Sequence, residues 1–233
     1  MSDISILAID LAKHSFQVCA TTAEGVVKFN RKYSRGKLSQ LLAEHSSCLV
    51  AMEACATSHW WGRYAQEAGH EVRLIPPIYV KPFVKRSAKN DANDAAAIAT
   101  AVRQPGMRFV QVKSQEQQTH AMLFRTHQTL TRQRATLITT LRGHFAEHGI
   151  IVAKGDAALL AYEDTMEAQE GAMPDLVRET ARLYYHHMAQ LAQTIATLER
   201  QMADAAKEDE GIQRLRTMPG VGPITAPQPA AAS

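Results

Sequence analysis

Five short apolar runs lie within the first 75 residues, and their order limits the folds that this chain can adopt. The first three runs follow one another with only short turns between them, which is typical of an antiparallel meander. Helix-forming segments separate the third, fourth and fifth runs, and strands joined through helices usually pair in parallel. The pattern therefore predicts an α/β fold with a mixed sheet flanked by helices. The predicted strands are residues 4–9, 16–20, 26–30, 48–52 and 71–75, and the predicted helices between them are 34–44 and 57–68.

The second half of the chain is predicted to be helical. A helix starting at Asn90 or Asp91 is expected to run to Arg103, where Pro105 and Gly106 follow. A long helix with few breakers is predicted over residues 114–148, and a second over residues 174–207. We therefore place a domain boundary near residues 105–114, between an α/β domain and a long α-helical region.

The second long helix carries an apolar stripe whose steps alternate between four and three residues. This is the heptad period, which is typical of a coiled coil. The stripe can pack within a helical hairpin of one chain or between two copies of the chain. We expect self-association into a homo-oligomer through it. Its members are Tyr184, Met188, Leu191, Ile195, Leu198 and Met202.

Four acidic residues lie where predicted strands end or where a predicted helix begins. Asp10 closes the first strand and Glu53 the fourth, while Asp91 and Asp94 are three residues apart and so share one helix face. A turn or a helix cap explains any one of them alone. Their joint placement favours a shared site, because strand ends and a helix packed beside them can converge on one spot.

Clustered carboxylates repel one another, and a divalent cation removes that repulsion. Carboxylate oxygens are ligands that suit Mg²⁺ or Mn²⁺, and a pair of such ions can drive phosphodiester chemistry. We therefore predict a divalent-metal site, also the catalytic site, formed by Asp10, Glu53, Asp91 and Asp94.

Basic residues gather in two stretches, although the formal net charge of the whole chain is only +3. No acidic residue lies between Glu116 and Glu147, which favours a nucleic-acid surface over an ordinary charged helix face. The stretch before Asp91 can guide a phosphate backbone toward the carboxylates, or can be a solvated loop. The predicted nucleic-acid contacts are Lys85, Arg86 and Lys89 in the first stretch, and Arg125, Arg132, Arg134 and Arg142 in the second.

Cysteine content and the N-terminal sequence indicate the cellular compartment of the protein. The three cysteines form no CxxC pair, which argues against a disulfide framework. The N-terminus lacks the features of a signal peptide, and no apolar run is long enough to span a membrane. We expect a cytoplasmic protein without a membrane partner.

Three segments resemble the N-terminal domain of the DEDD insertion-sequence transposases. They are AIDLAKHSFQV, AMEACATSHWW and KRSAKNDANDAAAIA. The resemblance covers about residues 4–150. The family includes the pilin-gene invertase and the bridge-RNA-guided recombinases, and its domain is similar to the Holliday-junction resolvase RuvC. The resemblance implies a ribonuclease-H-like (RuvC-like) fold over residues 1–110, followed by a coiled-coil region over 114–208.

The resemblance also implies a function in DNA transposition. The metal ligands fall on Asp10, Glu53, Asp91 and Asp94, the partners are DNA and a structured guide RNA, and the cofactor is Mg²⁺ or Mn²⁺. The segment MPGVGPITA, within residues 209–226, resembles the opening of the family's C-terminal domain, which supplies a serine nucleophile.

Residues 227–233 form a low-complexity tail that we expect to be disordered. We therefore expect a C-terminally truncated transposase that does not complete strand exchange alone. Two other functions stay open: a catalytically silent remnant that binds nucleic acid or dimerises, and a stand-alone Mg²⁺-dependent junction nuclease.

Overall fold

The computed structural model describes residues 3–84, 90–168, 171 and 173–208. The chain divides into two compact units, with the boundary between Gln117 and Gln118. We call residues up to Gln117 the α/β unit and the residues that follow the helical unit. None of the helices in the described ranges is long and apolar enough to cross a bilayer.

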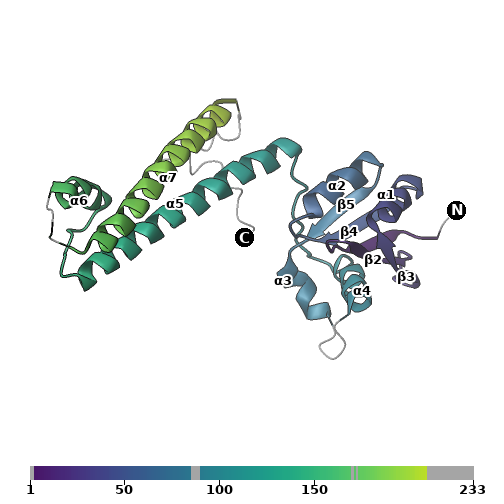
Figure 1. The fold of residues 1–233 in the computed structure, drawn as a ribbon. Coiled ribbons are helices and arrows are strands. Elements are labelled where there is room, and N and C mark those ends of the chain that lie inside the picture. Colours follow the sequence, from purple (N-terminus) through teal and green to yellow (C-terminus); the bar gives the residue numbers. More distant parts are fainter. Residues whose placement is uncertain (1–2, 85–89, 169–170, 172, 209–233) are drawn as a thin grey trace. The chain divides into compact units, whose positions relative to one another are not determined.

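A five-stranded mixed sheet forms the centre of the α/β unit (Figure 1), in the order β3-β2-β1-β4-β5. The first three strands pair antiparallel, and β4 and β5 extend the sheet in parallel from β1. This order confirms the predicted mixed sheet and is consistent with a ribonuclease-H-like fold. The strands are β1 (Ile6–Asp10), β2 (Ser15–Thr21), β3 (Val27–Ser34), β4 (Leu49–Glu53) and β5 (Glu71–Ile75).

Side chains alternate between the two faces of the sheet, and helices cover both faces. Leu7 and Ile9 face the core under α1 (Arg35–Glu44) and α2 (Ser58–Glu67). On the opposite face Ile6, Ala8 and Cys19 pack with α4. The helices on this second face are α3 (Pro77–Val80), the short 3₁₀ helix at Lys81–Phe83, and α4 (Asp91–Ala101).

Three helices make up the helical region: α5 (Gln115–Glu147), α6 (Asp156–Ala168) and α7 (Asp175–Glu208). The two long helices confirm the prediction, and α6 is an addition that the sequence analysis missed. Helix α5 starts at a reciprocal cap: the Ser114 hydroxyl accepts from the backbone N–H of Gln117 at 3.1 Å, and the Gln117 side chain accepts from that of Ser114 at 3.0 Å.

The first two members of the apolar stripe of α7, Tyr184 and Met188, pack with α5 and α6 of the same chain. Met188 lies in one cluster with Leu141 and Phe145 of α5 and with Leu159 of α6. The Tyr185 hydroxyl donates to the backbone carbonyl of Leu159 at 2.9 Å. Of the two arrangements open to the stripe, packing within a helical hairpin is therefore present. A coiled coil between copies of the chain stays a prediction.

Candidate metal-binding carboxylate site

Asp10 and Glu53 end neighbouring parallel strands. Ile9 of β1 and Met52 of β4 are in register, so the next residue of each strand lies side by side. Both acids follow a residue of the face that packs on α1 and α2, so they belong to the face that carries α4. Both side chains are half-buried at this edge. The sheet thus brings two carboxylates together beside the first turn of α4.

Helix α4 adds a third carboxylate to this group. The Asn90 side chain caps the helix by accepting from the backbone N–H of Asn93 at 2.9 Å, which places Asp94 in the first turn. The following buried alanines pack on β1 and β2 and hold the helix against the sheet. The Oδ1 atom of Asp94 is buried and has no hydrogen-bond partner among the described residues.

The charges of these carboxylates act on one another. Burial raises the pKa of Asp10, and the negative charges of Asp94 and Asp91 raise it further. Burial also raises the pKa of Glu53, with added repulsion from Asp10 and Asp94. Asp10, Glu53, Asp91 and Asp94 thus lie close enough for their charges to act on one another. Asp10, Glu53 and Asp94 form the half-buried part of this cluster.

Asp91 is in a different environment from the other three acids. Its carboxylate is exposed and forms an ion pair with Lys32 of β3 at 2.7 Å. The hydrogen bond from Lys32 and its positive charge lower the pKa of Asp91. In this structure Lys32 therefore neutralises the charge of Asp91. Asp91 would have to release Lys32 to bind a cation.

Two polar side chains that the sequence analysis missed hold the first turn of α4. The Gln17 side chain is buried and donates to Oδ1 of Asn30 at 2.6 Å, and Asn30 in turn donates to the backbone carbonyl of Ala92 at 2.8 Å. Gln17 lies directly opposite Asp10 in the sheet. A signal for this pair was present in the sequence, because Gln17 interrupts an otherwise apolar strand.

The donor set fits a divalent cation in its chemistry. It offers carboxylate oxygens, one of them buried with no partner from the described residues, and its charges repel in the absence of a cation. In the described ranges, however, no three His, Cys, Asp or Glu side chains are already drawn together as the ligands of an ion. Binding would therefore require side-chain movement, including the release of Asp91 from Lys32.

Neutralising one member of the cluster should stabilise the metal-free protein at neutral pH. A carboxylate with a raised pKa in the folded state costs stability as pH rises through the interval between its ordinary and its raised value. Asp10→Asn should therefore raise the free energy of unfolding at pH 7 by about 1 kcal/mol, or roughly 4 °C, after allowance for screening by water. The measurement is thermal unfolding in EDTA.

The gain from Asp10→Asn should shrink as pH falls toward about 4, the ordinary range of aspartate. Asp164→Asn on the exposed surface of α6 serves as the matched control and should leave the melting temperature unchanged. A loss of stability in Asp10→Asn at neutral pH would contradict the repulsion described above.

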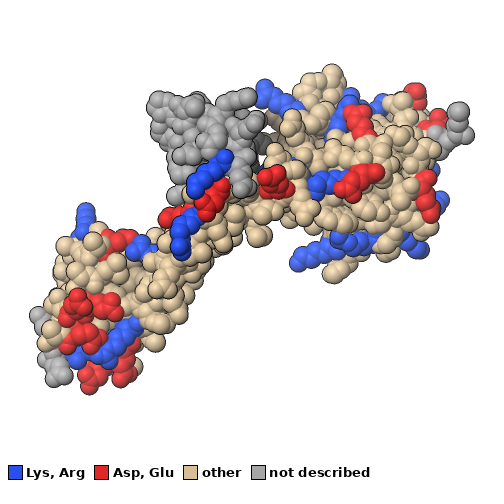
Figure 2. Space-filling view, turned by 90° about the horizontal axis from the view of Figure 1, so that it is seen from above, with Lys and Arg blue, Asp and Glu red and all other residues tan. Residues whose placement is uncertain are grey.

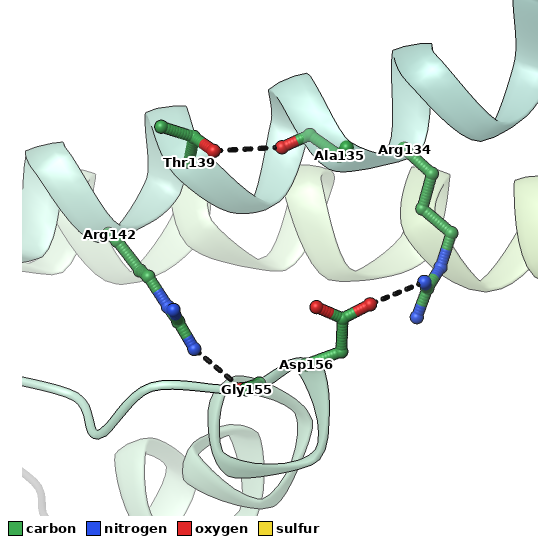
Figure 3. A network of polar contacts seen from close by, with 6 residues as sticks. All are labelled: Arg134, Ala135, Thr139, Arg142, Gly155 and Asp156. Atoms are coloured by element: carbon green, nitrogen blue, oxygen red, sulfur yellow. Dashed lines mark hydrogen bonds and ion pairs between the residues drawn. The ribbon is translucent and has the colours of Figure 1, made fainter.

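The predicted nucleic-acid residues have different surroundings. Lys85, Arg86 and Lys89 lie outside the described residues. Arg125 and Arg132 are exposed on α5. Arg134 and Arg142 instead hold the start of α6 (Figure 3): Arg134 pairs with Asp156 at 2.7 Å, and Arg142 donates to the carbonyls of Ala153 and Gly155.

The chain is similar over most of its length to known transposases. The family model for the IS110-type DEDD transposases, described as a transposase, matches residues 7–150. A probable family 20 transposase of Pseudomonas aeruginosa is 40% identical over 99% of this chain and 69% of its own length. The transposase for insertion sequence element IS1328 of Yersinia enterocolitica is 37% identical over 97% of this chain and 67% of its own length.

A third relative is the transposase for insertion sequence element IS1111A of Coxiella burnetii. It is 35% identical over 97% of this chain, which spans 62% of that relative's length. The match of the family model covers nearly all of the sheet, α4 and the whole of α5, and so includes all four acids. The chain belongs to the IS110-type DEDD transposase family.

Proposed function

We propose that this chain supplies the metal-binding carboxylates for the breakage and joining of DNA phosphodiester bonds during transposition. The observation that carries the proposal is the buried Oδ1 of Asp94, which has no hydrogen-bond partner in the described part of the chain, beside two strand-end carboxylates whose pKa values are raised. The family membership supports a role in transposition.

Each residue has a defined part in the proposed site. Asp10, Glu53 and Asp94 would hold Mg²⁺ or Mn²⁺ through their oxygens, and Asp91 would join them after leaving Lys32. Once bound, the metal would supply charge stabilisation for the attacking and leaving oxygens of the phosphodiester. Gln17 and Asn30 orient the first turn of α4, so that Asp94 stays directed toward the strand ends.

The proposal extends to the partners of the chain. DNA is the substrate, and a structured guide RNA is the second nucleic acid. Arg125 and Arg132 are exposed on α5 and are suited to phosphate contacts there, whereas Arg134 and Arg142 first stabilise the connection to α6. A homo-oligomer would allow the carboxylate sites of different copies to act on different DNA strands.

The test is DNA cutting and joining with purified protein. The chain is incubated with Mg²⁺, donor and target DNA, and the RNA of the insertion element, with and without the C-terminal part of a relative added in trans. Asp10→Asn and Asp94→Asn should each lower the yield of cut or recombinant DNA by about 100-fold or more. The reason is that loss of a residue that binds the metal costs more activity than loss of a residue that only hydrogen-bonds to a metal ligand. Asp164→Asn is the control. Equal yields from the wild type and the two variants would contradict the proposal.

A further inference from the structure

Five basic residues fall within ten positions of β3 and the start of α1. They are Lys28, Arg31, Lys32, Arg35 and Lys37, and no acidic residue lies between Glu24 and Glu44. All five are exposed. Figure 2 shows Lys and Arg side chains gathered along one edge of the α/β unit. We call these five residues the β3 basic strip.

The strip follows the edge strand of the sheet into the start of α1, and it reaches the carboxylate site at its middle member, Lys32. Lys32 is in register with Gln17, and Gln17 is in register with Asp10. These three residues therefore form one cross-strand row on the face that carries α4. The ion pair between Lys32 and Asp91 links the strip to the carboxylate site at the same point.

Most of the positive charge of the strip is not cancelled by the protein. In the described part of the chain, Lys28 pairs with Asp3 and Lys32 with Asp91, both as exposed ion pairs. The guanidinium groups of Arg31 and Arg35 lie over aromatic rings instead, Arg35 at 4.5 Å from the ring centre of Trp60. Contacts of this kind hold the side chain but leave its charge available to an anion.

Lysine on an edge strand also prevents sheets from joining edge to edge. That role accounts for Lys28 and Lys32 but not for Arg35 and Lys37, which lie beyond the strand at the start of α1. It also does not account for the connection of the strip with the carboxylates. A negatively charged ligand that lies along the strip and reaches the carboxylate site accounts for the basic residues of α1 and for their connection with the carboxylates.

We propose that the β3 basic strip binds the phosphate backbone of the DNA strand that the carboxylate site acts on. This inference rests on the proposed function. From Lys28 to Lys32 the strand rises about 13 Å at roughly 3.3 Å per residue, a length that spans about two to three successive phosphates of one DNA strand. Lys32 would place the nearest phosphate close to Asp10 and Asp94.

The test is the salt dependence of DNA binding by the full chain, measured by fluorescence anisotropy in EDTA. The variant Lys28→Gln/Arg31→Gln/Lys37→Gln leaves Lys32 and Arg35 in place, and its three changes are all on the exposed surface. Each lost phosphate contact reduces the slope of log K against log salt by about 0.9. The triple variant should therefore bind a short DNA duplex with a slope shallower by about 2 to 3 units.

A charge-matched control is Lys154→Gln/Arg200→Gln/Lys207→Gln, which changes three exposed residues of the helical unit. Its slope should stay close to that of the wild type. A β3 variant with the wild-type slope, or equal losses in both triple variants, would contradict the proposal. Absence of DNA binding by the wild type would also contradict the proposal. A β3 variant that loses binding only to a structured RNA probe would contradict it as well.

Two further measurements distinguish failure of this proposal from failure of the proposed function. Asp10→Asn/Asp94→Asn should retain DNA binding in EDTA, because neither carboxylate attracts phosphate. The β3 triple variant should retain Mn²⁺ binding, measured by calorimetry, because Asn30, Lys32 and the four acids are unchanged. Loss of Mn²⁺ binding in the β3 variant would indicate damage to the carboxylate site and would contradict a role in DNA binding alone.

Discussion

Mn²⁺ is expected to raise the melting temperature of the wild-type chain, and Asp10→Asn with Asp94→Asn is expected to abolish that rise. A ligand that binds only the folded state stabilises it by RT ln(1 + [L]/Kd), which is about 2.7 kcal/mol at a hundredfold excess over Kd. The double variant removes two of the three half-buried carboxylates and their shared charge. Differential scanning calorimetry with and without Mn²⁺ gives the comparison.

The same experiment separates metal binding from a general effect on stability. In EDTA the double variant should be at least as stable as the wild type, because repulsion among the carboxylates is relieved. Asp164→Asn on α6 should keep the full rise with Mn²⁺. An undiminished rise in the double variant would assign the stabilising ion to another part of the chain.

Leu191→Asp should destabilise the helical unit by about 3 kcal/mol or more. The Leu191 side chain is 6% exposed, and a carboxylate there would be buried without a partner. Leu183 lies on the same helix but is 71% exposed, so Leu183→Asp is a matched control with an expected change below about 0.5 kcal/mol. Thermal unfolding and light scattering are measured together on both variants.

This pair of variants also tests the arrangement of the heptad stripe. Packing within one chain predicts that Leu191→Asp loses stability at every protein concentration, because its neighbours belong to the same chain. Self-association through the stripe predicts in addition that Leu191→Asp lowers the mass seen by light scattering, whereas Leu183→Asp, outside the stripe, leaves that mass unchanged. Unchanged stability of Leu191→Asp would contradict the packing of α5, α6 and α7 described above.

The fold of the α/β unit could be predicted from the sequence because its local signals agree with one another. The strand runs are short and bounded by turns, and Ser34 and Asn90 cap the helices that they were expected to begin. The boundaries of β3 were less well predicted: it extends to Ser34, four residues beyond the predicted end. Edge strands bury little apolar surface, so their ends leave a weak pattern in the sequence.

The arrangement of the site depended on tertiary contacts that no local pattern reveals. The sequence indicated four equivalent acids, but the structure distinguishes Asp91, which Lys32 neutralises, from the three half-buried carboxylates. It also brings Asn30 to Ala92, a contact between residues 62 positions apart. The partners of Arg134 and Arg142 lie at the unpredicted start of α6 or just before it, so the roles of these arginines in packing were not visible.

Anomalous scattering from crystals grown with Mn²⁺ tests the central claim most directly. Data collected at the manganese absorption edge locate the ion without reference to any assumed ligand. We expect a peak bounded by the carboxylates of Asp10, Glu53 and Asp94, with Asp91 released from Lys32. An α/β unit whose carboxylates carry no manganese, in crystals where the ion is bound elsewhere on the chain, would contradict the account.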